Sequence, residues 1–133
     1  MSFAEDSRRV ALEWVKCGTE GRFDDLMALG APDATWWISG TSPYSGTQPY
    51  AERVKQMKEL FKEAISVTFT IGGITAEGDT VVLEGMPRAE AKDGRIYVND
   101  IMIKFVVKDG RFQSVREYVD FGPVIKFIGG KAT

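Results

Sequence analysis

The feature that most constrains the fold is a change of hydrophobic period after Glu63. Val67, Phe69 and Ile71 alternate with threonines, which is the period-two pattern of a half-buried strand. Three further strands are predicted by the same pattern, each following a short turn at 77–79, 92–94 or 108–110, and they cover 81–85, 96–107 and 112–121. The Asp-Gly pairs in the last two turns are strong hairpin signals. The second half of the chain therefore predicts a meander of antiparallel strands.

The first half has helical periodicity. Residues 3–19 carry apolar side chains at helical spacing, including Val10, Trp14 and Cys17. Shorter helices are expected at 23–29 and at 49–62, the latter beginning with proline. Between them lie a turn at 31–33, a strand at 34–38 and a polar loop at 39–48. A loose tail is expected at 129–133.

This order of elements predicts an α+β protein in which helices pack on one face of a curved sheet. The 133 residues fit one domain, so we expect a single domain over residues 1–133. We find no internal repeat and no linker.

Composition excludes several kinds of chemistry. The chain has no histidine and one cysteine, Cys17. Catalysis by Ser-His-Asp or Cys-His is therefore excluded, and no disulfide or zinc site is expected. Phosphate-binding glycine motifs are absent as well. We accordingly predict no cofactor and no metal, so that any acid-base chemistry must come from Asp, Glu, Lys, Tyr or Cys17.

Charge and hydropathy narrow the partners. The net charge of −2 gives no support for nucleic-acid binding. No apolar run is long enough to span a membrane, and the first residues lack the apolar segment of a signal peptide. These features predict a cytoplasmic protein without nucleic-acid or membrane partners.

Four phrases, in this order and spacing, resemble the nuclear transport factor 2-like superfamily, and within it the SnoaL-like and ketosteroid isomerase-like proteins. The phrases are RFDDLMALGAPDATWWI (22–38), GTSPYSG (40–46), KDGRF (108–112) and EYVDF (117–121). The resemblance implies a cone: a strongly curved antiparallel sheet wrapped by the N-terminal helices around an apolar pocket. It also implies a homodimer formed through the outer face of the sheet. It is less informative about activity, because one fold hosts many functions.

The known catalytic positions of these relatives are mostly changed here. The base of the ketosteroid isomerases falls on Ile38, their tyrosine donor on Trp14, and their protonated aspartate near Ile101. The Arg-Asp pair of the limonene-epoxide hydrolase-like members falls on Gly85 and Pro87. Steroid isomerisation or epoxide hydration by those mechanisms is therefore not expected.

What remains is Asp120: the phrase EYVDF resembles the strand that carries a catalytic aspartate in the epoxide hydrolase-like and SnoaL-like cyclase groups, and Asp120 matches that position. Strand parity places Asp120 with Tyr118 on one face and Val115 with Val119 on the other. If the more apolar face forms the core, Asp120 lies in solvent. The resemblance implies the opposite orientation, with Asp120 in the pocket.

Several other residues are candidates for the site, each with a structural alternative. Asn99 could orient a substrate carbonyl or water, or it could bond to the backbone at a strand end. The expected substrate-binding residues are Trp14, Trp36, Tyr44, Tyr97, Ile101 and Tyr118. The two tryptophans could equally be core residues, and Tyr44 could be a solvent-side turn residue.

Two functions follow. The first is a cofactor-free cyclase or isomerase that uses Asp120 as general acid/base on a small, carbonyl-containing substrate, with Asn99, Tyr118 or Trp14 stabilising negative charge. The second is a non-catalytic module of the same fold that binds an apolar ligand or a protein. The aspartate at the matching position favours the first, and the changed positions favour the second.

Overall fold

The boundary between the helical half and the sheet half lies at Ala64, as the change of period predicts. The computed structural model describes residues 3–129. Its helices are α1 (Phe3–Glu20), α2 (Phe23–Ala28), α3 (Tyr50–Leu60) and α4 (Gly122–Ile128). Its strands are β1 (Gly30–Ile38), β2 (Gly46–Pro49), β3 (Ala64–Glu77), β4 (Thr80–Ala91), β5 (Ile96–Val98), β6 (Ile101–Lys108) and β7 (Arg111–Tyr118).

The strands form one mixed sheet in the order β2-β1-β7-β6-β4-β3, with β5 paired to β4. The pairs β3–β4, β4–β6 and β6–β7 are antiparallel, as the turn signals predict. The pair β1–β7 is parallel, with Trp36 opposite Val115, so the sheet is not antiparallel throughout. A parallel neighbour requires a long connection, and nearly the whole sheet half of the chain lies between these two strands.

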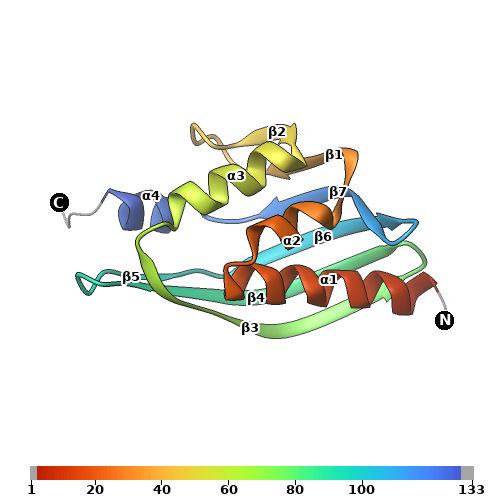
Figure 1. Ribbon diagram of the computed structural model, residues 1–133, viewed down its shortest axis with the longest axis horizontal. Helices are drawn as coiled ribbons and strands as arrows, with labels where there is room; N and C mark the ends of the chain where they lie inside the picture. Colours follow the sequence, from red (N-terminus) through yellow and green to blue (C-terminus); the bar gives the residue numbers. More distant parts are fainter. Residues whose placement is uncertain (1–2, 130–133) are drawn as a thin grey trace.

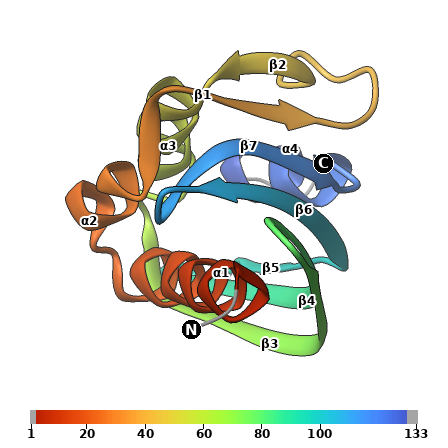
Figure 2. The same ribbon diagram turned by 90° about the vertical axis from the view of Figure 1, so that its right-hand side faces the viewer.

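The sheet curves around the helical layer. Figure 1 shows α1, α2 and α3 on one side of the sheet, and Figure 2 shows the strands β6, β4 and β3 bending around α1. The predicted α+β architecture, a curved sheet wrapped by N-terminal helices, is confirmed. Among residues 3–129, no helix is long and apolar enough to cross a membrane.

The core lies between α1 and the concave face of the sheet. Trp14 of α1 packs edge-on against Phe105 of β6, with ring centroids 5.3 Å apart. Phe105 in turn stacks on Phe112 of β7 at 4.7 Å. Burial of each large apolar side chain contributes about 1.5–3 kcal/mol, so these aromatic contacts between layers fix the position of α1 on the sheet.

Several boundaries differ from the sequence prediction. The expected turn at 31–33 is part of β1, and β2 forms within the expected loop at 39–48. The expected strand at 96–107 is interrupted at Asn99 and Asp100, where the pairing partner of β4 changes from β5 to β6. Residues 130–133 of the expected loose tail lie outside the described residues.

The helix α4 was not predicted, because it is too short for a clear helical pattern. Its Val124 and Phe127 are buried in a small cluster against β5, and Figure 1 shows α4 beside the β4–β5 hairpin. Phe61 stacks on Phe127 at 5.7 Å and packs against Tyr97 at 5.3 Å. This cluster closes the end of the cone near Glu117.

The orientation of β7 is the main correction. Phe112 and Val115 are both fully buried, although they have opposite parity. The pairing register between β6 and β7 shifts between Val106 and Val107. A bulge of this kind turns the residues that follow it in β7 to the other face of the sheet, so Phe112 and Val115 can both be buried. Val115 and Val119 therefore point inward, whereas Asp120 is exposed. Burying the apolar face of β7 stabilises the fold more than burying its polar face would.

Candidate functional site

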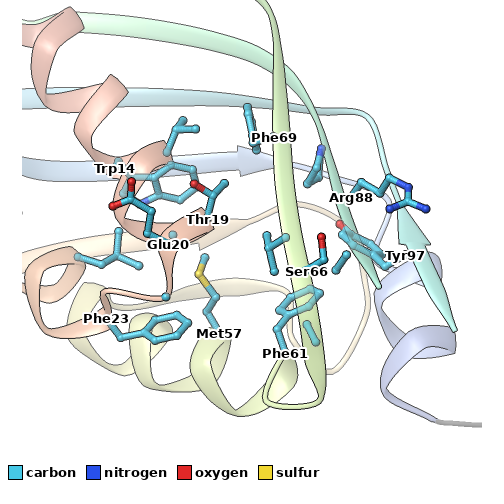
Figure 3. A pocket seen from close by; sticks show the side chains of 18 of the residues that line it. Trp14, Thr19, Glu20, Phe23, Met57, Phe61, Ser66, Phe69, Arg88 and Tyr97 are labelled. Carbon is cyan, nitrogen blue, oxygen red and sulfur yellow. The ribbon is translucent and has the colours of Figure 1, made fainter. Parts of the chain in front are cut away.

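A cavity of about 340 Å³ opens between the helices and the strands β3 and β4. Its walls are mostly apolar and aromatic, and they include Trp14, Phe23, Met57, Phe61, Phe69, Tyr97 and Ile101. Figure 3 shows Trp14 and Phe23 at one end of the cavity and Phe61 and Tyr97 at the other. Arg88 borders the cavity, but its guanidinium points away from it in the same view.

Glu117 of β7 brings a carboxylate to this cavity. In the sheet it lies between Ile38 of β1 and Ile103 of β6, two apolar neighbours. The indole nitrogen of Trp36 donates a hydrogen bond to Glu117 Oε1 at 3.1 Å. Burial raises the pKa of Glu117 to about 7, although the Trp36 hydrogen bond and the charge of Arg53 act in the opposite direction. A carboxyl group that titrates near neutrality suits proton transfer.

Arg53 of α3 is a buried charged residue, 2% exposed, near Glu117. Its guanidinium donates to the carbonyl oxygens of Trp36 at 3.3 Å and Gly46 at 2.6 Å, and to Gln56 Oε1 at 2.9 Å. Burial lowers the pKa of Arg53, and the nearby charge of Glu117 partly opposes this. Arg53 therefore ties α3 to β1 and β2 and places a positive charge near Glu117.

Tyr97 supplies a hydroxyl group at the same end of the cavity. Burial raises the pKa of Tyr97, so the hydroxyl stays protonated at neutral pH. Asn99 Nδ2 donates to the Tyr97 oxygen at 3.0 Å, and the Asp100 N–H fixes the Asn99 amide by donating to its Oδ1 at 2.9 Å. Because the Tyr97 oxygen accepts from Asn99, its own proton is free to be donated elsewhere.

Asp120 lies outside this arrangement. It follows the end of β7, its side chain is exposed, and its Oδ1 accepts from the Gly122 N–H at 3.1 Å. It borders a separate, more open pocket of about 580 Å³ together with Asn99 and Asp100. Asp120 therefore acts locally as a turn residue before α4.

The other predicted residues divide into two groups. Trp14, Tyr97 and Ile101 line the cavity, and Trp36 contacts its carboxylate. Asn99 reaches the site only through Tyr97, and its Nδ2 also donates to the Asp120 carbonyl at 2.8 Å.

Two tyrosines lie elsewhere. Tyr44 stacks on Phe121 at 4.9 Å and does not line the cavity. Tyr118 is 46% exposed on the outer face of the sheet, against Trp37 at 5.1 Å. Tyr44 and Tyr118, which the sequence predicts to bind substrate, therefore lie outside this cavity.

The Trp14 indole is a poor donor to a ligand. Its Nε1 is buried and makes no hydrogen bond within the described residues. It lies beside the Tyr50 hydroxyl. Burial raises the pKa of Tyr50, and the nearby Trp14 indole partly opposes this rise. We therefore treat Trp14 as an apolar wall of the cavity.

Sequence reasoning missed Glu117 and Arg53. The sequence did carry a signal for Glu117, since it is the one charged residue on the otherwise apolar face of Val115, Val119 and Phe121. Arg53 had no comparable signal, because an arginine beside Val54 on a helix is usually solvated. Within residues 3–129, no three side chains of the types that ligate metals gather closely enough to hold an ion.

Comparison with known proteins agrees with this architecture. Residues 11–115 match the SnoaL-like domain family, so the chain belongs to that family, and the predicted nuclear transport factor 2-like superfamily is confirmed. No curated protein sequence matches the chain.

Three solved structures illustrate the shared fold. PrhC from Penicillium brasilianum has a TM-score of 0.83 at 14% identity, over 97% of this chain and 91% of that one. An LEH-like epoxide hydrolase from M. tuberculosis has a TM-score of 0.73 at 18% identity, over 96% and 92%. An NTF2-like protein from Burkholderia pseudomallei has a TM-score of 0.76 at 20% identity, over 92% and 97%. Identities this low show the fold alone.

Proposed function

We propose that this protein is a cofactor-free acid/base enzyme that moves a proton on a small, largely apolar, carbonyl-containing substrate. The observation that carries the proposal is the Glu117 carboxylate, which borders an apolar cavity and has a pKa of about 7. At neutral pH such a group is present in both protonation states, so it can accept a proton and return it.

The proposed reaction is an isomerisation or an aldol-type cyclisation. The Glu117 carboxylate removes a proton from the carbon next to the carbonyl, and the electron pair of the broken C–H bond moves toward the carbonyl oxygen. The Tyr97 hydroxyl donates a hydrogen bond to the negative charge that develops there. In an isomerisation, Glu117 returns the proton to a different carbon of the conjugated enolate. In a cyclisation, the enolate carbon bonds to a second carbonyl carbon, and the oxygen of that carbonyl takes up the proton from Glu117.

Epoxide hydration fits less well, although one structural neighbour is named as an epoxide hydrolase. The positions of its expected Arg-Asp pair are occupied by Gly85 and Pro87, which carry no charge. A non-catalytic binder of apolar ligands is the remaining candidate, and the mainly apolar walls of the cavity favour it as much as they favour an enzyme.

Paired variants test the proposal. We would screen small cyclic ketones and β-dicarbonyl compounds for exchange of the α-hydrogen with deuterium by NMR, using wild-type protein, Glu117→Gln and Asp120→Asn. The proposal predicts exchange with wild type and Asp120→Asn, and a loss of about 100-fold or more with Glu117→Gln. Binding of the compounds without exchange would instead favour the non-catalytic binder.

We also propose a homodimer through the outer face of the sheet. That face exposes Met86, Met102 and Tyr118 at 42–48%. Trp37 lies beside Tyr118, with the Arg116 guanidinium 3.9 Å from a Trp37 ring centroid. Aromatic, methionine and arginine side chains are enriched at protein interfaces, which supports a second copy as the partner.

A further inference from the structure

A second, smaller cavity also borders Glu117. Its volume is about 60 Å³, and its lining includes four residues with polar side chains: Arg53, Gln56, Tyr97 and Glu117. A water molecule occupies about 30 Å³ in the liquid and needs two to four polar partners in a protein interior. The small cavity satisfies both conditions, so it can hold water where the apolar cavity favours an organic ligand.

The two charges that border this cavity are incompletely satisfied. Glu117 Oε1 accepts from Trp36, whereas Glu117 Oε2 makes no hydrogen bond within residues 3–129. The three nitrogens of Arg53 each make one hydrogen bond, all to neutral acceptors. A guanidinium has five N–H groups, so two of those of Arg53 have no acceptor in the described part of the chain. Arg53 is buried, and buried donors are nearly always paired, with protein or with water.

Within residues 3–129, Arg53 and Glu117 do not form a direct ion pair. The charge of each nevertheless shifts the pKa of the other. The neighbouring elements bring Tyr97 from β5, Trp36 from β1 and Ile103 from β6, none of which is charged at neutral pH. The large cavity is bordered by two further charged residues, which have partners of their own: Glu20 with Arg22 at 2.8 Å and Arg88 with Glu90 at 3.5 Å. Arg53 is therefore the available counter-charge for an ionised Glu117.

We propose that the small cavity binds water that hydrogen-bonds the Glu117 carboxylate to the Arg53 guanidinium, which makes Arg53 a positioning residue for that carboxylate. The water completes the hydrogen bonds of both groups and screens the charge of Glu117 when it ionises. Glu117 thus borders both the cavity proposed for an organic ligand and the cavity proposed for water. The positioning role of Arg53 in catalysis rests on the proposed function, whereas the presence of water in the small cavity does not.

The first test removes the charge of Arg53. The titration of Glu117 is followed by carbon-13 NMR of its carboxyl group, which needs no substrate, in wild type, Arg53→Gln and Arg53→Lys. We expect Arg53→Gln to raise the pKa of Glu117 by about one unit or more, and Arg53→Lys to raise it less because the charge is kept. An unchanged pKa in Arg53→Gln would overturn the proposal.

The second test fills the cavity and leaves the hydrogen bonds of Arg53 in place, in case Arg53→Gln does not fold. Val119 and Val124 both border the cavity. In wild type we expect NMR cross-relaxation between water and the Val124 methyl groups. Val119→Met should abolish that signal and raise the pKa of Glu117, whereas Val82→Met, outside both cavities, should change neither. A wild-type protein without the water signal would overturn the proposal.

The two proposals fail separately. Loss of exchange activity in Glu117→Gln, with no water signal in wild type, would retain the enzyme and refute the water site. A water signal and a pKa shift in Arg53→Gln, without any activity, would retain the water site and refute the enzyme.

Discussion

The Glu117 carboxyl group has a raised pKa because burial penalises its charged form more than Trp36 and Arg53 stabilise that form. The energetic consequence can be measured directly. In the unfolded chain such a group loses its proton near pH 4.5, whereas in the folded protein it keeps the proton until about pH 7. The folded state therefore binds more protons between these values, and the contribution of Glu117 to stability falls as the pH rises through this window.

Glu117→Gln removes this dependence. Each unit of pKa corresponds to about 1.4 kcal/mol. We expect the variant to gain stability relative to wild type by on the order of 2 kcal/mol between about pH 4 and about pH 8, allowing for solvent that reaches the cavity. Urea denaturation at several pH values measures this difference. A difference that is constant with pH would show that Glu117 does not titrate in this window.

The hydrogen bond from Trp36 to Glu117 favours the ionised carboxylate. Trp36→Phe keeps an aromatic ring and removes the donor, so the pKa of Glu117 should rise by about half a unit to one unit. Trp37→Phe is the matched control, because Trp37 lies on the outer face of the sheet. Equal shifts in both variants, measured by carboxyl NMR, would contradict this assignment.

At the scale of elements, the cavity depends on a close contact between β3 and β4. A methyl group at Gly85 would lie 2.2 Å from the Phe69 ring and 3.1 Å from the Thr70 carbonyl oxygen. Phe69 lines the cavity. Gly85 therefore allows the Phe69 ring to lie flat across the neighbouring strand.

Gly85→Ala should destabilise the fold by about 1–3 kcal/mol and displace the Phe69 ring. Gly73→Ala is the control, since its methyl group would meet nothing within 4 Å. It should be neutral or slightly stabilising. Thermal unfolding of both variants checks the contrast, and a Gly85→Ala protein as stable as Gly73→Ala would refute it.

The elements that could be predicted from the sequence are those that local patterns determine. The hairpins from β3 to β7 follow from alternation and Asp-Gly turns, which act locally. The bulge that turns Val115 inward depends on pairing with β6 and left no sequence signal. Parity could therefore group Asp120 with Tyr118 and Val115 with Glu117, but only the packed sheet decides which group faces the core.

For the whole molecule, the order of helices and strands predicted the architecture, and the same order together with four local phrases predicted the family. The candidate site was predicted in part: Trp14, Tyr97 and Ile101 line the cavity, whereas its carboxylate is Glu117. Arg53 could not be predicted, because its burial results from β1, β2 and α3 meeting around it. Such charges depend on long-range packing that one sequence does not reveal.

The proposed homodimer is also a property of the whole molecule. Met102 lies opposite Tyr118 near the centre of the exposed outer face. Met102→Glu should weaken association at least about tenfold by placing a charge in an apolar interface. Leu12→Glu, an exposed apolar position on α1, should have no effect. Analytical ultracentrifugation distinguishes these outcomes, and a wild-type monomer at high concentration would exclude the dimer.

The central claim is that Glu117 is the carboxylate of the cavity and is poised for proton transfer. The most direct measurement is its pKa, by carbon-13 NMR of the carboxyl groups, with Glu117→Gln to assign the signal. The account predicts a value of about 7. A value near the ordinary one for glutamate, about 4.5, would mean that solvent or a direct cation stabilises the charge, and would contradict the claim.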